Sequence, residues 1–190
     1  MEAVEAIMTR RSIAQMAGHR PERASVVKLL QAAVRAPNHH LTQPWRFIVL
    51  TGRGLDALGE AMAERIRRES VGDPDLARKV EAERARPHRA PVIVTVVYVP
   101  SEHPRAVEAE DRYAVGAAIQ NVLLAAHAEG LATYLRTGPA AQDPAVRSLL
   151  GLTEGEEIAG FVYLGYPSTA PGPLTQREPA EERVRWIGWD

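Results

Sequence analysis

The sequence contains no cysteine, so it can form no disulfide, no cysteine-ligated zinc site, no iron–sulfur cluster and no thiol nucleophile. It lacks a charge excess, because 23 basic residues stand against 24 acidic ones, and this argues against nucleic acid or an anionic membrane as partner. It has no apolar run long enough to span a bilayer, and its first residues are acidic where a secretory signal is basic. We therefore expect a cytoplasmic protein.

What is present is typical of a globular protein: 190 residues, of which 45% are hydrophobic and 25% charged. This is enough for one core, and we expect a single domain over residues 1–190. Residues 166–190 are rich in Pro, Ser, Thr and Gly and carry Trp186 and Trp189. Since exposed tryptophans are unfavourable, we expect an extended tail over 166–190 that packs on another subunit.

Helical periodicity predicts helices in several places. A short helix carries Val4, Ile7 and Met8 on one face, and a second helix follows Pro21 with Ser25 as its expected N-cap. Further helices are expected over residues 55–66 and 111–129 and, with Asp143 as its cap, from residue 144 to Gly151. Strands are predicted at 45–50, 92–99, 131–135 and 158–164, the second of them central and covered on both faces.

The stretch Glu64–Arg89 is dense in charge, with Leu76 and Val80 as sparse apolar anchors. We expect it to be helical and exposed, and it is a candidate for a lid.

One loop, Ala36–Trp45, lies between a predicted amphipathic helix and a predicted strand. Pro37 and Pro44 bracket it, so neither element can run through it. It concentrates amide, imidazole and hydroxyl groups, which is typical of a binding loop held by a rigid scaffold.

Two familiar kinds of site can be set aside. Residues 52–57 match a G-x-G-x-x-A dinucleotide pattern, but no second strand ending in an acid follows about 20 residues later, so we interpret them as a turn after an edge strand. His39 and His40 are adjacent, their side chains are expected to diverge from extended backbone, and no H-E-x-x-H pattern exists, so we expect no metal site. A Ser/His/Asp triad stays open, although no G-x-S-x-G sequence is present.

Arg10-Arg11-Ser12 stands at a helix-to-loop junction. Two guanidinium groups and a hydroxyl suit a phosphate, whereas solvated surface arginines are the plainer alternative. Arg136-Thr137, directly after a predicted strand, repeats the same chemistry.

Taken together, these segments resemble the nitroreductase family of FMN enzymes, over nearly the whole chain. The resemblance lies in Arg10-Arg11-Ser12, in Arg35-Ala36-Pro37 followed by Gln43-Pro44-Trp45-Arg46-Phe47, and in the late strand 160–167; its form is that of the small NAD(P)H nitroreductases. It implies an α+β fold with a central mixed β-sheet flanked by helices. It also implies an intertwined homodimer with FMN at the subunit interface.

By the same resemblance, eight residues bind FMN. Six come from one subunit and two, Arg35 and His39, from the other; the six are Arg10, Arg11, Ser12, Leu135, Arg136 and Thr137. NADH or NADPH is the implied electron donor, near Ala125–Gly130. This chain has Asn38-His39-His40-Leu41 where larger members have serine-rich sequence, and Leu135 where small members can have Trp, and both differences leave the substrate open.

The implied activity is ping-pong hydride transfer from NAD(P)H to a small-molecule acceptor such as a nitroaromatic or a quinone. FMN carries that chemistry, so no residue is expected to be catalytic in its own right. Two alternatives remain: a related FMN enzyme with another substrate, such as a dehydrogenase or a flavin-consuming enzyme, and a non-enzymatic flavin-binding protein.

Overall fold

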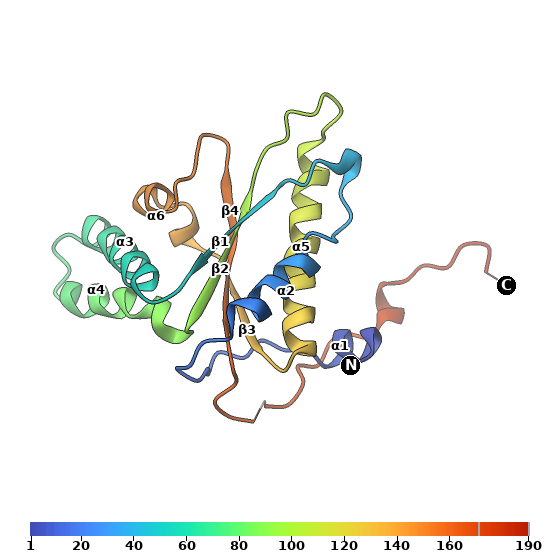
Figure 1. Ribbon diagram of the computed structural model, residues 1–190, viewed down its shortest axis with the longest axis horizontal. Helices are drawn as coiled ribbons and strands as arrows, with labels where there is room; N and C mark the ends of the chain where they lie inside the picture. The colour runs from blue at the N-terminus through green and yellow to red at the C-terminus, as the bar shows by residue number, and fades with distance from the viewer. Residues whose placement is uncertain (171, 190) are drawn as a thin grey trace.

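A four-stranded antiparallel sheet organises the chain, in the order β1-β2-β4-β3 (Figure 1). The computed structural model describes residues 1–170 and 172–189. The strands are β1 (Trp45–Leu50), β2 (Val92–Tyr98), β3 (Ala132–Arg136) and β4 (Glu157–Gly165). The helices are α1 (Ala3–Thr9), α2 (Arg23–Ala33), α3 (Arg53–Glu69), α4 (Leu76–Arg84), α5 (Glu108–Ala128) and α6 (Pro144–Leu149), with short 3-10 helices η1 (His39–Leu41), η2 (Arg86–Arg89), η3 (Pro139–Ala141) and η4 (Ala180–Arg183).

Helices cover the sheet on both faces (Figure 1). Strand β2 is buried along its whole length, as its continuous β-branched sequence predicts. Its alternate residues Val94 and Val96 pack with α2 and α5, whereas Ile93 packs with α3 and α6 on the other face. The prediction of a central strand covered on both sides is therefore confirmed.

The expected mixed sheet is wrong for this chain, because all pairings among the described residues are antiparallel. Leu50 at the end of β1 pairs with Ile93 at the start of β2, so the long connection through α3 and α4 returns to the end of the sheet that it left. Alternation of helices and strands in sequence does not distinguish such a return from a crossover to a parallel strand.

Helix ends follow local chemistry in some places and packing in others. Asp143 caps α6 by accepting hydrogen bonds from the amides of Ala145 and Val146, as predicted. The N-cap expected at Ser25 is wrong: α2 begins at Arg23, one turn earlier, and the N-cap residue Glu22 makes no side-chain bond. The residues before Val26 already belong to α2, and the helix buries the Val26 side chain. This packing overrides the preference of Ser25 for the N-cap position.

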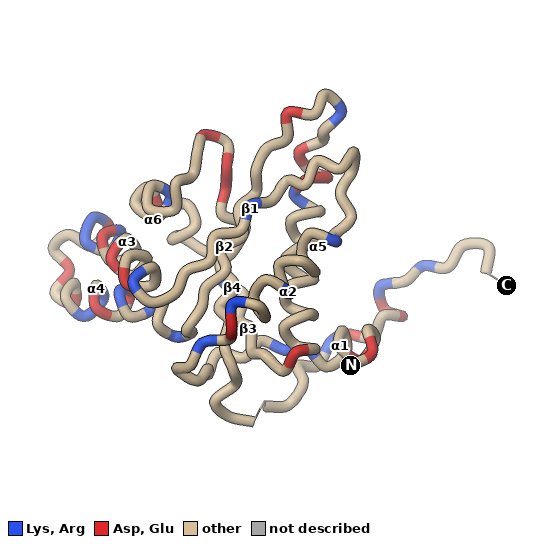
Figure 2. Tube along the Cα trace, viewed as in Figure 1, with Lys and Arg blue, Asp and Glu red and all other residues tan. Residues whose placement is uncertain are grey.

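The charged stretch 64–89 forms the end of α3, α4 and η2, and Figure 2 shows charges of both signs gathered there. Gly59 allows the two helices to touch, because a Cβ at this position would lie 2.3 Å from the carbonyl oxygen of Arg84. No helix within residues 1–170 and 172–189 is both long and apolar enough to cross a membrane.

The tail leaves the body beside α1 and extends outward (Figure 1). Its side chains Trp186, Ile187 and Trp189 are 65%, 82% and 79% exposed. Residues 171 and 190 of the predicted tail lie outside the described residues. A surface of this kind is unusual on a protein that functions as a single chain.

Candidate cofactor-binding site

The segment Arg10–Ser12 follows α1 and lies beside β3. The next residue, Ile13, donates its amide to the carbonyl oxygen of Thr133 at 2.9 Å, which fixes the segment against the strand. Arg11 donates to the carbonyl oxygen of Gly172, and Ser12 is exposed. The segment is thus held by its backbone, and the side chains of Arg10 and Ser12 make no protein hydrogen bond among the described residues.

The second predicted segment continues β3 along the same edge. Leu135 and Thr137 are exposed, and the Arg136 guanidinium lies 5.8 Å from the centre of the Tyr134 ring. Because Leu135 is only two residues beyond Thr133, the structure brings the two predicted segments together.

Gly160 of β4 shapes this edge, a role that the sequence pattern did not single out. A Cβ at Gly160 would lie 2.8 Å from Leu135 Cδ1 and 3.4 Å from the carbonyl oxygen of Arg136. The absence of a side chain therefore lets residues 135–137 lie directly on β4. A glycine inside a strand pattern is the signal that could have identified it.

The donor set at this edge suits a phosphate ester. Three guanidiniums, of Arg10, Arg11 and Arg136, have no carboxylate within ion-pair distance in the part of the chain that the structure describes. Nine of the other eighteen arginines form ion pairs, five of them on α3 and α4, and the remaining nine form none among the described residues. Two adjacent guanidiniums without a carboxylate partner, followed by a hydroxyl, are groups that bind a phosphate dianion, so Arg10, Arg11 and Ser12 fit the phosphate end of a flavin mononucleotide.

His127 lies in the last turn of α5 and is a neighbour of Arg10 and Arg11. The family resemblance singles it out only as part of the range 125–130, near the electron donor. His127 Nε2 lies 2.9 Å from Thr9 Oγ1. Burial lowers the pKa of His127, and the positive charges of Arg10 and Arg11 lower this pKa further.

The loop before β1 is held in an unusual shape. His40, Leu41 and Gln43 all have positive φ, at 53°, 54° and 45°. Asn38 Oδ1 accepts the Gln43 amide at 2.9 Å, and Thr42 Oγ1 donates to the buried carboxylate of Asp111 at 2.6 Å. These bonds fix the loop to the start of α5.

The expectation that the two adjacent histidines diverge is wrong. The rings of His39 and His40 stack at 3.9 Å, and His40 stacks on His103 at 4.9 Å. They converge because the loop here forms η1 with a left-handed residue and is not extended. Burial is the largest cause that lowers the pKa of His40, followed by the charges of His39 and His103.

His39 lies far from Arg10–Ser12 within one chain. His39 Nδ1 lies 2.6 Å from Glu110 near the start of α5, whereas Arg10 acts on His127 near its end. These two positions on α5 are roughly 25 Å apart at about 1.5 Å per residue. One chain therefore does not bring all eight predicted residues together.

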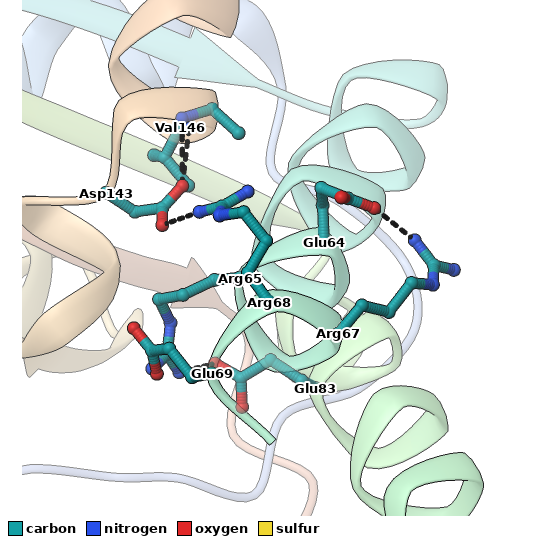
Figure 3. A network of polar contacts seen from close by, with 9 residues as sticks. Glu64, Arg65, Arg67, Arg68, Glu69, Glu83, Asp143 and Val146 are labelled. Atoms are coloured by element: carbon teal, nitrogen blue, oxygen red, sulfur yellow. Dashed lines mark hydrogen bonds and ion pairs between the residues drawn. The ribbon is translucent and has the colours of Figure 1, made fainter. Parts of the chain in front are cut away.

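The candidate lid is anchored by buried ion pairs (Figure 3). Arg65 is 8% exposed and donates to Glu83 at 3.2 Å and to Glu69 at 2.6 Å. Arg68 donates to the buried Asp143, the cap of α6, and so connects α3 to the chain that leaves β3. Whether the 64–89 stretch moves as a lid stays a prediction.

The turn expected over residues 52–57 is confined to Gly52, with φ 47°, because Arg53 already begins α3. Gly52 follows β1, which stands at the edge of the sheet. Strand β2 pairs with β1 in the antiparallel direction, whereas a dinucleotide-binding unit needs a parallel strand there. Within the described residues, no group of three or more His, Cys, Asp or Glu side chains could hold a metal ion.

Comparisons with known proteins agree on one family. The model described as "Nitroreductase family" matches residues 7–166. YdjA of Escherichia coli K12, provisionally named an NAD(P)H nitroreductase, is 33% identical over 88% of this chain and 89% of its own length. A nitroreductase-like family protein from Bacillus cereus has a TM-score of 0.84 at 28% identity, covering 99% of this chain and 97% of that protein. A provisionally named nitroreductase from Desulfovibrio desulfuricans, crystallised with FMN, has a TM-score of 0.75 at 25% identity, with coverages of 100% and 99%.

Proposed function

The chain belongs to the nitroreductase family, and on that premise we propose that it is an FMN-dependent oxidoreductase that uses NADH or NADPH to reduce nitroaromatics, quinones or related acceptors. FMN is bound in the Desulfovibrio relative, and YdjA is named for NAD(P)H and nitro substrates. The observation that carries the proposal is the Arg10–Ser12 segment, which the Ile13–Thr133 hydrogen bond holds beside β3 and whose two guanidiniums form no ion pair among the described residues.

The functional unit in this proposal is a homodimer with FMN at the subunit interface. Arg35 and His39 complete the site of the partner, as the family resemblance implies, and in its own chain His39 lies too far from Arg10–Ser12 to contribute there. Exposed apolar side chains support an interface: Val4, Ile7 and Met8 on α1, Tyr113 on α5, and the tryptophans of the tail. The tail over 166–190 packs on the partner, and the interface removes these exposed apolar side chains from water.

When bound, FMN supplies hydride transfer between the nicotinamide and the acceptor. Arg10, Arg11 and Ser12 would hold its phosphate and ribityl end, and Leu135, Arg136 and Thr137 would contribute to the rest of its site. The positive charge of Arg136 favours an anionic ring. Donor and acceptor use one pocket in turn, which gives ping-pong kinetics, and no side chain forms a covalent bond to substrate.

Three observations on the purified protein test the proposal. A protein that is yellow, or that takes up FMN, agrees with all flavin hypotheses, whereas a colourless protein that cannot be reconstituted contradicts them. Bleaching of the flavin by NADH or NADPH in the absence of oxygen separates a reductase from a flavin-binding protein. A screen of nitroaromatics, quinones and other acceptors on the reduced protein then distinguishes a nitroreductase from an FMN enzyme with another substrate.

A further inference from the structure

The hydrogen bonds around His127 determine which of its nitrogens carries a proton. The Thr9 hydroxyl has one hydrogen, and it donates this hydrogen to the carbonyl oxygen of Glu5 at 2.6 Å. Thr9 Oγ1 can therefore only accept from His127 Nε2, which lies 2.9 Å away. The ring is held with its hydrogen on Nε2, and Nδ1 is the nitrogen that gains or loses a proton.

The charges that act on His127 come from α1 and the segment that follows it. Arg10 and Arg11 follow α1 and disfavour a protonated ring, whereas Glu5 on α1 favours it. Glu129, directly after α5, is paired with Lys28 of α2 at 2.6 Å. Burial and the two arginines favour the neutral ring, and a phosphate dianion beside the arginines would oppose their effect.

We propose that His127 is a further FMN-binding residue, which takes up a proton at Nδ1 when the phosphate binds beside Arg10 and Arg11. The inference rests on the proposed function and adds to it a residue that makes phosphate affinity depend on pH. His127 becomes a third cation at the phosphate, present only when the phosphate is there to stabilise it.

The direction of the pH dependence follows from linkage. Binding raises the pKa of His127, so the added affinity is fully present below the pKa of the flavin-free protein and is lost as pH rises through the pKa of the complex. If binding raises the pKa of His127 by one, the affinity for FMN below both pKa values is about tenfold higher. The phosphate itself takes up a second proton at about pH 6. The FMN affinities should therefore be compared at pH values above this one.

The experiment titrates the full-length protein, stripped of flavin, with FMN and with riboflavin, and follows flavin fluorescence at pH 6.5 and 8.5. Riboflavin lacks the phosphate and is the matched ligand control. The variant His127→Gln keeps a donor for Thr9 but does not titrate. His88→Gln is the matched protein control, because His88 pairs with Asp56 on the α3 side of the sheet.

The expected result is about fivefold tighter FMN binding at pH 6.5 than at 8.5 in the unchanged protein and in His88→Gln. In His127→Gln the FMN affinity should vary less than twofold, and riboflavin should show no pH dependence in any variant. Calorimetry in two buffers of different ionisation enthalpy should show proton uptake with FMN that His127→Gln abolishes.

Two outcomes would overturn the role of His127 while leaving the proposed function intact: the same pH dependence in His127→Gln, or the same dependence with riboflavin. Failure of the unchanged protein to bind either flavin at both pH values would instead overturn the proposed function, and the role of His127 with it.

Discussion

At the scale of single residues, the loop before β1 shows where packing overrides local preference. Leu41 and Gln43 adopt positive φ, which for a non-glycine residue costs about 1 kcal/mol or more each. The contacts of Asn38 within the loop and of Thr42 with Asp111 offset this cost. Strained residues of this kind cluster at functional sites, which agrees with the proposed role of His39.

Arg10→Ala should weaken FMN binding by roughly tenfold or more, because a charged hydrogen bond to phosphate contributes about 1.5–3 kcal/mol. Arg53→Ala, which changes an exposed arginine at the start of α3, is the control and should retain FMN. Dissociation constants from fluorescence titration provide the comparison. Equal affinities in the two variants would contradict the placement of the phosphate at Arg10.

Gly160→Ala should weaken flavin binding, because the new methyl group would lie 2.8 Å from Leu135 Cδ1 and so displace the Leu135 side chain. Gly116→Ala on α5 is the control, since a Cβ there meets nothing within 4 Å. FMN affinity and the melting temperature should be measured together. Unchanged affinity in a stable Gly160→Ala protein would show that residues 135–137 do not contact the flavin.

At the scale of elements, α3 and α4 form one unit through buried charge and not through a broad apolar face. Glu83 is 3% exposed and accepts from both Arg65 and Arg86, while Val80 is the buried apolar side chain of α4. The stability of such a unit should change little when a surface ion pair is lost, but it should fall when a buried charge loses its partner.

Glu83→Gln should destabilise the protein by about 3 kcal/mol, because it leaves the buried guanidinium of Arg65 without its charge partner on α4. Glu81→Gln is the matched control, as Glu81 pairs with Arg84 at the surface of the same helix. Urea unfolding measures both. A midpoint for Glu83→Gln equal to that of Glu81→Gln would show that the two helices are held by other contacts.

At the scale of the whole molecule, the distribution of exposed apolar side chains is the feature that supports the proposed homodimer. Figure 2 shows α5 nearly without charge along its middle and the tail standing apart from the sheet. If the flavin site uses residues of two chains, dimerisation and cofactor binding are linked equilibria.

The double variant Trp186→Ser/Trp189→Ser should shift the protein toward monomer and reduce its FMN content in parallel. Light scattering after size-exclusion chromatography gives the mass, and the absorbance of bound flavin gives the occupancy. Val71→Ser is the control, because Val71 is 83% exposed at the turn between α3 and α4, away from the tail. A monomer that still binds a full equivalent of FMN would contradict a shared site.

The sequence by itself determined the elements and the chemistry. Continuous β-branched residues specify β2, Asp143 caps α6, and Arg10-Arg11-Ser12 carries the donor groups of the proposed phosphate site, because these properties depend on near neighbours in the chain. Only the tertiary structure decided the antiparallel sheet, the stacking of His39 on His40, the contact of Gly160 with Leu135 and the position of His127 beside Arg10. Each of these depends on the direction in which a connection returns or on a backbone angle set by distant contacts, and no local pattern encodes either.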